Sequence, residues 1–152
     1  MNEIFKLSET DVKLIAEACF KLLQKEPKIK YALGREWLKQ FPNKAGIYAI
    51  YDLDELVYIG ETAKINKRMG DLRRTANHTF RKKLAKKKFP QAEIIKGKYK
   101  FKISIEEKLN KYCIENISIS SLVLPFGRLE VETNLIEEYT KTKLNSPSKR
   151  SQ

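Results

Sequence analysis

Apolar residues recur at helical spacing near the start of the chain, at Leu14, Ile15, Ala18, Leu22 and Leu23. Ser8, a residue type that caps helices, precedes them, and Pro27 follows them. The pattern predicts an amphipathic helix over residues 9–25. Residues 28–42 are ambiguous, and a second short helix through Arg35-Glu-Trp-Leu38 is one interpretation.

Two aromatic and β-branched runs come next, over residues 45–51 and 56–60, with Asp52-Leu-Asp54 between them. This arrangement predicts a β-hairpin. Further along, the pattern predicts two basic helices, the second with Asn77 as a candidate cap, and then a helix, a strand and a last helix. Their ranges are 64–76, 78–88, 104–115, 117–124 and 128–142.

Composition limits the class of protein. The chain has 152 residues, of which 41% are hydrophobic, so it can bury one ordinary core and should form a single compact domain. The N-terminus lacks the basic and apolar regions of a signal peptide, and the longest uncharged run, 116–127, is too short to cross a bilayer. We therefore expect a cytoplasmic protein with no membrane partner.

Cysteine and histidine usage narrows the metal chemistry. Cys19 and Cys113 lie far apart without a CxxC motif, and His78 is the single histidine. Neither a disulfide framework nor a zinc site of Cys and His ligands can be built from them. Any catalytic metal must therefore be a hard ion held by oxygen ligands.

The positive charge of the chain is concentrated in its middle. The formal net charge is +12, and residues 64–102 alone hold 15 basic and 2 acidic residues. Such a block is typical of proteins that bind a polyanion, although a solvated helix face is the ordinary meaning of a charge run. A membrane surface is a weaker candidate because the segment offers few large apolar residues.

Tyr48 and Tyr58 lie on the two strands of the predicted hairpin. If Tyr51 pairs with Glu55 around the loop 52–54, Tyr48 stands opposite Tyr58 and both project to one face. A four-residue loop would shift the register by one and place them on opposite faces. Either tyrosine alone is more readily explained as an ordinary core residue.

Glu132 is the least ordinary residue of the last predicted helix. On a helical wheel it falls in the middle of an apolar stripe formed by Leu129, Leu135, Ile136 and Tyr139. A buried carboxylate without a partner is costly, so Glu132 requires a cation, either an arginine or a divalent metal. Arg68 flanks the apolar side of its own helix and could bind a phosphate or pair with Glu132.

Taken together, these residues resemble the GIY-YIG nuclease family. The resemblance rests on Gly46-Ile47-Tyr48, Tyr58-Ile59-Gly60, Thr62, Arg68, the segment from Glu132 to Ile136, and Asn145. It implies an α/β (α+β) fold, with a small mixed three-stranded sheet flanked by helices. The expected division is an N-terminal helical extension (1–42), a GIY-YIG-like nuclease domain (43–146) and a polar tail (147–152). The helix of the extension would cap the sheet, form a dimer or contact nucleic acid.

The resemblance also implies a metal-dependent endonuclease that hydrolyses phosphodiester bonds in DNA, in restriction, repair or the biology of mobile elements and phages. Glu132 would hold a single Mg²⁺ or Mn²⁺, and Arg68 would bind the scissile phosphate. Tyr48 and Tyr58 would border the attacking water, one of them as general base, and Asn145 would support the site. A phenol is a poor base at its ordinary pKa, so either the metal and Arg68 lower that pKa or a water on the metal acts as the base.

One position departs from the family. Many relatives carry a His or Tyr four residues after the arginine, whereas this chain has Leu72, which cannot transfer a proton. Either a tyrosine takes the whole role of the base, which we favour, or His78 reaches in from the next helix; His78 could also serve as a phosphate contact or an auxiliary group. An alternative function is a nucleic-acid-binding module on the same fold that does not cleave.

Contacts with nucleic acid are expected from residues near the motifs and in the basic block: Gly60, Thr62, Lys67, Arg73, Arg74, His78, Arg81 and Lys82. Gly60 would permit close approach of its backbone. Because one active site cuts one strand, double-strand cleavage would need a homodimer or two binding events, and the sequence leaves both open.

Overall fold

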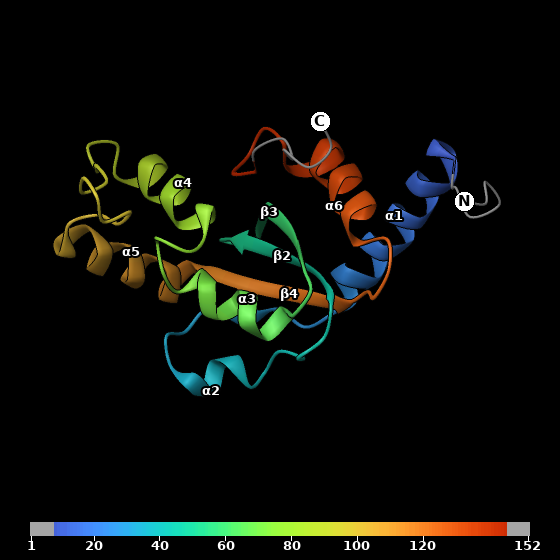
Figure 1. Cartoon of the computed structure of the whole chain (residues 1–152), viewed down its shortest axis with the longest axis horizontal. Coiled ribbons are helices and arrows are strands. Elements are labelled where there is room, and N and C mark those ends of the chain that lie inside the picture. Colours follow the sequence, from blue (N-terminus) through green and yellow to red (C-terminus); the bar gives the residue numbers. More distant parts are fainter. Residues whose placement is uncertain (1–7, 146–152) are drawn as a thin grey trace.

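The computed structural model describes residues 8–145 of the chain. In chain order its elements are α1 (Glu9–Lys25), β1 (Ile29–Lys30), α2 (Arg35–Leu38), β2 (Gly46–Asp52), β3 (Glu55–Thr62), α3 (Ile65–Leu72), α4 (Thr79–Lys88), α5 (Ile103–Asn116), β4 (Ile117–Val123), α6 (Arg128–Leu135) and the π-helical turn η2 (Ile136–Thr140) (Figure 1). The elements predicted from the sequence are all present, with bounds that differ by a few residues.

The strands form one sheet in the order β1-β4-β2-β3, and each neighbouring pair in residues 8–145 is antiparallel. The predicted fold class is confirmed. The sheet nevertheless has a fourth strand and no parallel pair, where we expected three strands and a mixed sheet. The fourth strand is β1, whose two residues are too few to show a strand pattern in the sequence. Because β1 lies before residue 43, the N-terminal extension is part of the sheet.

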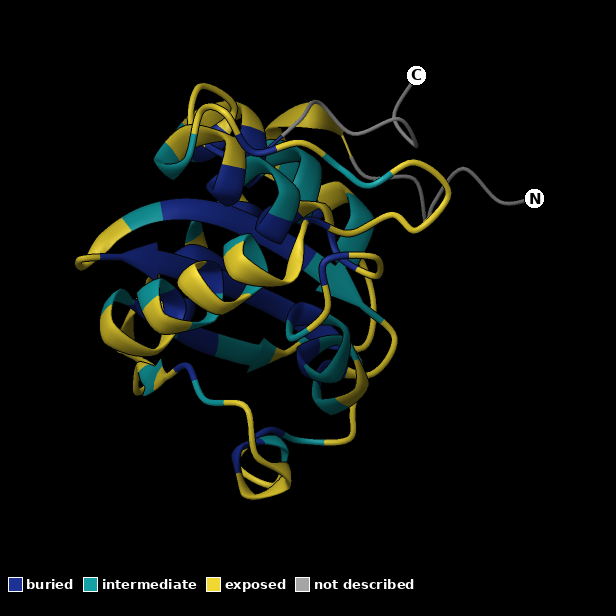
Figure 2. Ribbon diagram, turned by 90° about the vertical axis from the view of Figure 1, so that its left-hand side faces the viewer, coloured by how far each residue is buried: buried dark blue, intermediate teal, exposed yellow. Residues whose placement is uncertain are grey.

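Helices cover both faces of the sheet, so the strands are mostly buried (Figure 2). On one face, α1 and α6 pack over Ile47, Ala49 and Ile59. On the other face, α2 to α5 enclose a core that includes Tyr48 and Tyr58. Successive side chains of β2 therefore enter different cores, as the period of a strand requires.

The first helix begins as predicted, because the Ser8 hydroxyl oxygen accepts a hydrogen bond from the backbone N–H of Asp11 at 3.1 Å. Its buried face is not the predicted stripe. The side chains that pack on the domain belong to Ala16, Cys19, Phe20 and Leu23. Of the predicted stripe, only Leu23 is buried, and the other members are exposed to solvent.

The turn of the β2–β3 hairpin is shorter than the loop we considered. It consists of Leu53 and Asp54, whose φ angles are 50° and 66°, and Asp52 pairs with Glu55 across it. Two positive φ angles in a two-residue turn match the right-handed twist of the strands. This even-numbered loop by itself would place Tyr48 and Tyr58 on opposite faces.

A β-bulge reverses that outcome. Ile50 pairs with Tyr58, while the next residue of β2 pairs with Leu56, so Val57 is an extra residue on β3. Beyond the bulge, Tyr48 pairs with Gly60 and is diagonal to Tyr58. The two tyrosines therefore share a face, as expected, but in a register that the loop alone does not predict.

The later helices differ from prediction mainly at their ends. The cap of α4 is His78 and not Asn77, and α3 ends at Leu72. The last predicted helix is divided, because it continues beyond Leu135 as the π-helical turn η2. No helix within residues 8–145 is long and apolar enough to span a membrane.

Candidate active site

Two strands bring Tyr48 and Tyr58 together below the first turn of α4. Both side chains are buried, and their rings lie 6.3 Å apart at an interplanar angle of 24°. The ring of Tyr48 lies across Gly60, where a Cβ atom would come within 2.3 Å of the Tyr48 hydroxyl oxygen. The absence of a side chain at Gly60 therefore makes room for Tyr48, and this space is not open to nucleic acid.

His78 reaches Tyr48 from the start of α4. Its Nε2 atom lies 2.8 Å from the Tyr48 hydroxyl oxygen, and its Nδ1 atom accepts a hydrogen bond from the Phe80 backbone N–H at 3.1 Å. Burial, together with the charge of Arg68, holds the pKa of His78 well below its usual value, so the ring is neutral. Because a backbone N–H can only donate, the proton of His78 is on Nε2 and is donated to Tyr48.

This geometry tests the expectations for His78. Both ring nitrogens of His78 are bonded within the protein, so it has no free donor for a phosphate. Its Nδ1 atom accepts the hydrogen bond that caps α4, and its Nε2 atom is bonded to Tyr48. Leu72 is fully buried in the core. His78, which follows Leu72 by six residues, thus supplies an imidazole to the site.

The same charged groups act on the phenols of Tyr48 and Tyr58. Burial raises the pKa of Tyr48 well above its usual value, and the nearby Tyr58 raises it further, while Arg68 lowers it. Burial also raises the pKa of Tyr58, and Arg68 again acts in the opposite direction. Glu132 contributes to raising both values. Arg68 and Glu132 therefore lie close enough to act on both tyrosines.

Arg68 is held at the rim of the site by its own helix and the following loop. One terminal nitrogen, Nη1, donates to the Asp71 carboxylate at 3.3 Å and to the Asn77 carbonyl oxygen at 3.2 Å. The side chain is 30% exposed. The guanidinium is thus fixed in direction while remaining accessible to a ligand from solution. Asp71 follows Arg68 by three residues, a helical spacing that could have identified it in the sequence.

Glu132 approaches the same place from α6, on the other side of the edge strand β3. Its Oε2 atom accepts a hydrogen bond from the Glu61 backbone N–H at 2.7 Å. The residue is half-buried, whereas Val131, Leu135 and Ile136 of the same helix face are buried. On the helical wheel Glu132 falls between Leu135 and Ile136, as expected, and it is only partly withdrawn from solvent.

A hollow of about 430 Å³ opens beside these groups, lined by Glu61, Thr62, Ala63, Arg68, Asp71 and Arg128. Arg128 donates from Nε to the Glu61 carboxylate at 3.3 Å, so a second guanidinium borders the hollow. Neither Arg128 nor Glu61 stood out in the sequence as a site residue. They come from elements 67 residues apart, and no local pattern links them.

Asn145 lies at the outer edge of β3. Its side-chain amide accepts from the Ile59 backbone N–H at 2.7 Å and donates to the Ile59 carbonyl oxygen at 2.9 Å. It therefore pairs with the edge strand as a neighbouring strand would. Since β3 carries Tyr58 and Gly60, Asn145 supports the site by holding that strand.

The basic residues predicted to contact nucleic acid differ in how far they are buried. Arg81 is 1% exposed and forms a buried network with Glu106 at 2.9 Å, Tyr31 at 2.9 Å and Thr75 at 3.1 Å. The prediction that Arg81 binds nucleic acid is therefore wrong. It was wrong because charge in the sequence does not tell which basic residue of a helix faces the core.

Other members of the basic block remain accessible. Lys67 and Arg74 are exposed, and Thr62 and Lys82 are half-buried. Arg73 is also half-buried, but its Nη1 donates to the Leu33 carbonyl oxygen at 2.7 Å, so it ties α3 to the segment before α2. Of these residues, Lys67 and Arg74 have the exposed side chains that can contact a polyanion.

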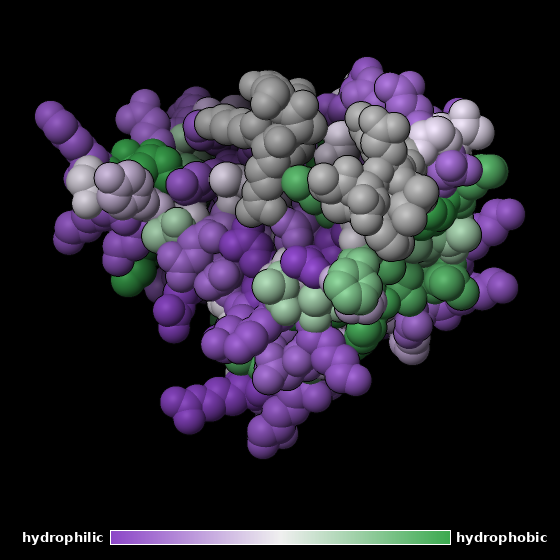
Figure 3. Space-filling model, turned by 45° about the vertical axis from the view of Figure 1, so that its right-hand side comes forward, coloured by the Kyte–Doolittle hydropathy of each residue, from purple (hydrophilic) through white to green (hydrophobic). Residues whose placement is uncertain are grey.

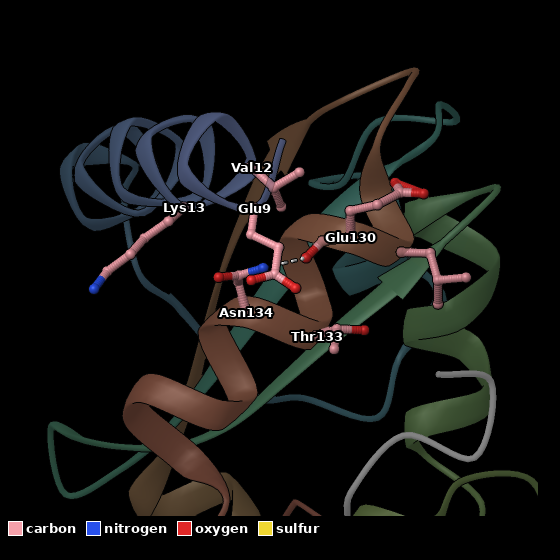
Figure 4. A pocket seen from close by; sticks show the side chains of 7 residues that line it. Glu9, Val12, Lys13, Glu130, Thr133 and Asn134 are labelled. Carbon is pink, nitrogen blue, oxygen red and sulfur yellow. Dashed lines mark hydrogen bonds between the residues drawn. The ribbon is translucent and has the colours of Figure 1, made fainter. Parts of the chain in front are cut away.

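A second hollow, of about 560 Å³, lies between the first turns of α1 and α6 (Figure 4). Glu9, Lys13 and Glu130 are among its lining residues, and Arg68 is not. With more acidic than basic groups on its walls, it is poorly suited to a phosphate chain. The hollow beside Arg68 is therefore the candidate active site.

The comparison with protein families fits this geometry. The model of the GIY-YIG catalytic domain matches residues 44–145, which is more than half of the chain. The chain belongs to the GIY-YIG family. In this GIY-YIG domain the two motifs lie on β2 and β3, and their tyrosines share one face of the sheet. Comparisons with curated proteins and with solved structures give no match. GIY-YIG membership implies a nuclease-type function.

The GIY-YIG resemblance also implies a divalent metal at Glu132. Within residues 8–145, no group of three or more His, Cys, Asp or Glu side chains could hold an ion. Glu132 is half-buried, and its carboxylate offers the oxygen ligands that a hard cation takes. Mg²⁺ is commonly held by one or two carboxylates, with water and phosphate oxygens completing its shell. The residues present fit an ion of this kind.

Proposed function

We propose that this protein is a metal-dependent DNA endonuclease that hydrolyses phosphodiester bonds with Mg²⁺ or Mn²⁺. The observation that carries the proposal is that four side chains meet the same part of β3. His78 is bonded to Tyr48, whose ring lies across Gly60, while Glu132 is bonded to the Glu61 backbone and Arg68 lines the same hollow as Glu61. Phosphodiester hydrolysis requires a cationic clamp for the phosphate, a group that takes a proton from water, and a site for a metal. The four side chains provide these three functions.

Arg68 is the proposed phosphate clamp. Its Nη1 is engaged by Asp71 and by the Asn77 carbonyl oxygen, which fixes the plane of the guanidinium. A planar guanidinium with a fixed direction can present its other donors to two phosphate oxygens at once. Arg128 borders the same hollow and would strengthen the positive potential for the chain of phosphates.

Tyr48 is the proposed general base. Because the His78 Nε2 proton is donated to the Tyr48 oxygen, the phenol's own proton must point elsewhere. If that proton leaves, the phenolate keeps the hydrogen bond from His78 and gains from the nearby charge of Arg68. His78 is then a positioning residue, and Tyr58 borders the water that Tyr48 would deprotonate.

Glu132 is the proposed metal ligand. The bound ion would act as a Lewis acid that neutralises charge on the phosphate oxygens. Glu132 itself is held in place by the Glu61 backbone N–H, so the carboxylate is anchored to the strand that carries Tyr58. Rigid support of this kind is what a catalytic ligand requires.

One observation favours the alternative function, a nucleic-acid-binding module that does not cleave. Burial raises the pKa of Tyr48 well above its usual value, which makes the phenolate scarce at neutral pH. The alternative predicts binding that weakens steeply with salt, without a metal-dependent product. The proposal predicts the same binding together with cleavage.

A plasmid assay separates the two functions. Supercoiled DNA is incubated with the protein in Mg²⁺, Mn²⁺ or EDTA, and nicked and linear products are quantified on gels. We expect products with either metal and none in EDTA. Arg68→Ala and Glu132→Gln should each reduce the rate by at least about 100-fold, a typical loss for a group that stabilises transition-state charge.

Two matched variants control for charge and for position in a helix. Glu138→Gln neutralises an exposed carboxylate six residues after Glu132, and Arg35→Ala removes an exposed guanidinium on α2. Both should cleave as the unmodified protein does. Salt-sensitive binding without products in either metal would reject the endonuclease and support the binding module.

A further inference from the structure

The helix α1 has two apolar faces, and only one of them packs on the domain. The outward face is formed by Leu14, Ile15, Ala18 and Leu22. Of these side chains, Leu14 is 65%, Ile15 42% and Leu22 53% exposed. At 100° per residue they fall within an arc of about 100°. A helix on the surface of a monomer normally carries polar residues on such a face.

The position of α1 leaves this face accessible. The helix lies at one end of the molecule, away from α4 and α5 (Figure 1). The space-filling view brings that end forward and shows hydrophobic side chains gathered on its right-hand side, whereas hydrophilic side chains dominate the left and lower parts (Figure 3). The apolar face is thus separate from the basic surface proposed for DNA.

The residues of this face are arranged symmetrically along the helix. Leu14 and Leu22 lie four residues before and after Ala18, and all three are exposed. Asp11 and Lys25 lie seven residues before and after Ala18, are also exposed, and fall within the same arc. The face therefore has a small residue at its centre, a leucine on each side, and opposite charges at its two ends.

We propose that this face binds α1 of a second copy of the chain in an antiparallel arrangement, with the two-fold axis beside Ala18. Leu14 then packs on the partner's Leu22, and Ala18 on the partner's Ala18, where small side chains allow the helices to approach closely. Asp11 lies opposite the partner's Lys25, and the symmetry repeats this pair. A parallel arrangement would instead place like charges together, which is unfavourable.

The pattern identifies a second copy better than it identifies another protein. An unrelated partner would have to be complementary to this face. Binding of such a partner would give no reason for the face to be complementary to itself. The distance along the helix from Asp11 to Lys25 is about 21 Å, at 1.5 Å per residue. A contact of one helix face on each side is small, so we expect a reversible dimer and not a permanent one.

Such a dimer would carry two copies of the proposed active site, one for each strand of a duplex. The association itself is independent of the proposed nuclease activity, because it involves α1 alone. It is therefore measured without DNA or metal. Each copy carries a net charge of +12, so the measurement uses physiological salt, which screens charges separated by more than about 8 Å.

The experiment is analytical ultracentrifugation over a concentration series that reaches the high micromolar range. The unmodified protein should change from monomer to dimer with rising concentration. Ala18→Glu places two carboxylates together at the axis and should weaken dimerisation at least about tenfold. Gln24→Glu adds the same charge at an exposed position outside the face and should dimerise normally. A protein that is monomeric at all concentrations, or an Ala18→Glu variant that associates equally well, overturns the proposal.

A charge exchange tests the antiparallel register and does not depend on Ala18→Glu. Asp11→Lys and Lys25→Asp should each weaken self-association, because each brings like charges together at both ends of the face. An equimolar mixture of the two variants restores both opposite-charge pairs and should form a heterodimer. Circular dichroism confirms that each variant is folded. Failure of the mixture to associate, when the unmodified protein does, rejects this pairing of the helices.

Discussion

Replacement of Gly60 by alanine would test how the site holds Tyr48. An added Cβ would lie 2.3 Å from both Cζ and Oη of Tyr48, whereas ordinary contact begins at 3.4 Å. The Tyr48 ring must therefore move by about 1.1 Å, or the β2–β3 pairing must open. Either movement disturbs the 2.8 Å contact between Tyr48 and His78.

The expected loss of stability has two parts. Overpacking of a tight core typically costs about 1–3 kcal/mol. Loss of a buried hydrogen bond, here between Tyr48 and His78, adds about 1–3 kcal/mol. Glycine in a strand is itself less favourable than alanine by about 0.5–1 kcal/mol, which offsets part of the cost. We expect Gly60→Ala to lower the free energy of unfolding by roughly 1–5 kcal/mol, with a loss of cleavage in the plasmid assay.

Urea unfolding provides the measurement. Gly34→Ala is the matched control, because its Cβ would meet no atom within 4 Å and its φ of −77° suits alanine. Because Gly34 is the N-cap of α2, where alanine is less favourable than glycine, that variant should lower the free energy of unfolding by no more than about 1 kcal/mol. The double variant Gly60→Ala, Tyr48→Leu should be less destabilised than the sum of its single variants, since the shorter side chain removes the clash. A Gly60→Ala protein with unchanged stability would refute the proposed role of Gly60.

Three further predictions follow from the burial and bonding of individual side chains. Arg81→Met should lower the free energy of unfolding in urea by about 3 kcal/mol or more, because it leaves Glu106 without its cation, whereas Arg74→Met, at an exposed position, should not. Asn145→Ala removes two hydrogen bonds to the β3 backbone and should cost about 1–3 kcal/mol; an unchanged urea midpoint would argue against its role in holding β3. Burial raises the pKa of Tyr48, so a base that must be deprotonated should make the nicking rate rise about tenfold per pH unit between roughly pH 6 and 9, and a rate independent of pH would exclude Tyr48 as the base.

The order and type of the elements could be predicted from the sequence because they depend on near neighbours. Ser8 and Pro27 marked the ends of α1, and runs of aromatic and β-branched residues marked β2 and β3. The two motifs and their spacing also indicated the family, which the match over residues 44–145 confirms. Both kinds of signal can be identified from the types and the spacing of residues along the chain.

The site required the tertiary structure. His78 and Tyr48 are 30 residues apart, and Arg128 and Glu61 are 67 apart. The register that places the two tyrosines on one face depends on the β-bulge at Val57, which no residue type in the sequence predicts. The first contact joins the start of α4 to β2 and the second joins the start of α6 to β3, so no window of the sequence contains them.

The burial of individual side chains also could not be predicted from the sequence. Composition determined that the chain is strongly basic, and the charge block determined where a polyanion would be attracted, but only packing decided that Arg81 is buried while Arg74 is exposed. In the same way, the apolar spacing determined that α1 is a helix, and packing decided that Leu14 and Leu22 face outward. Periodicity tells which side chains share a face, whereas the partner that covers that face comes from distant parts of the chain or from another molecule.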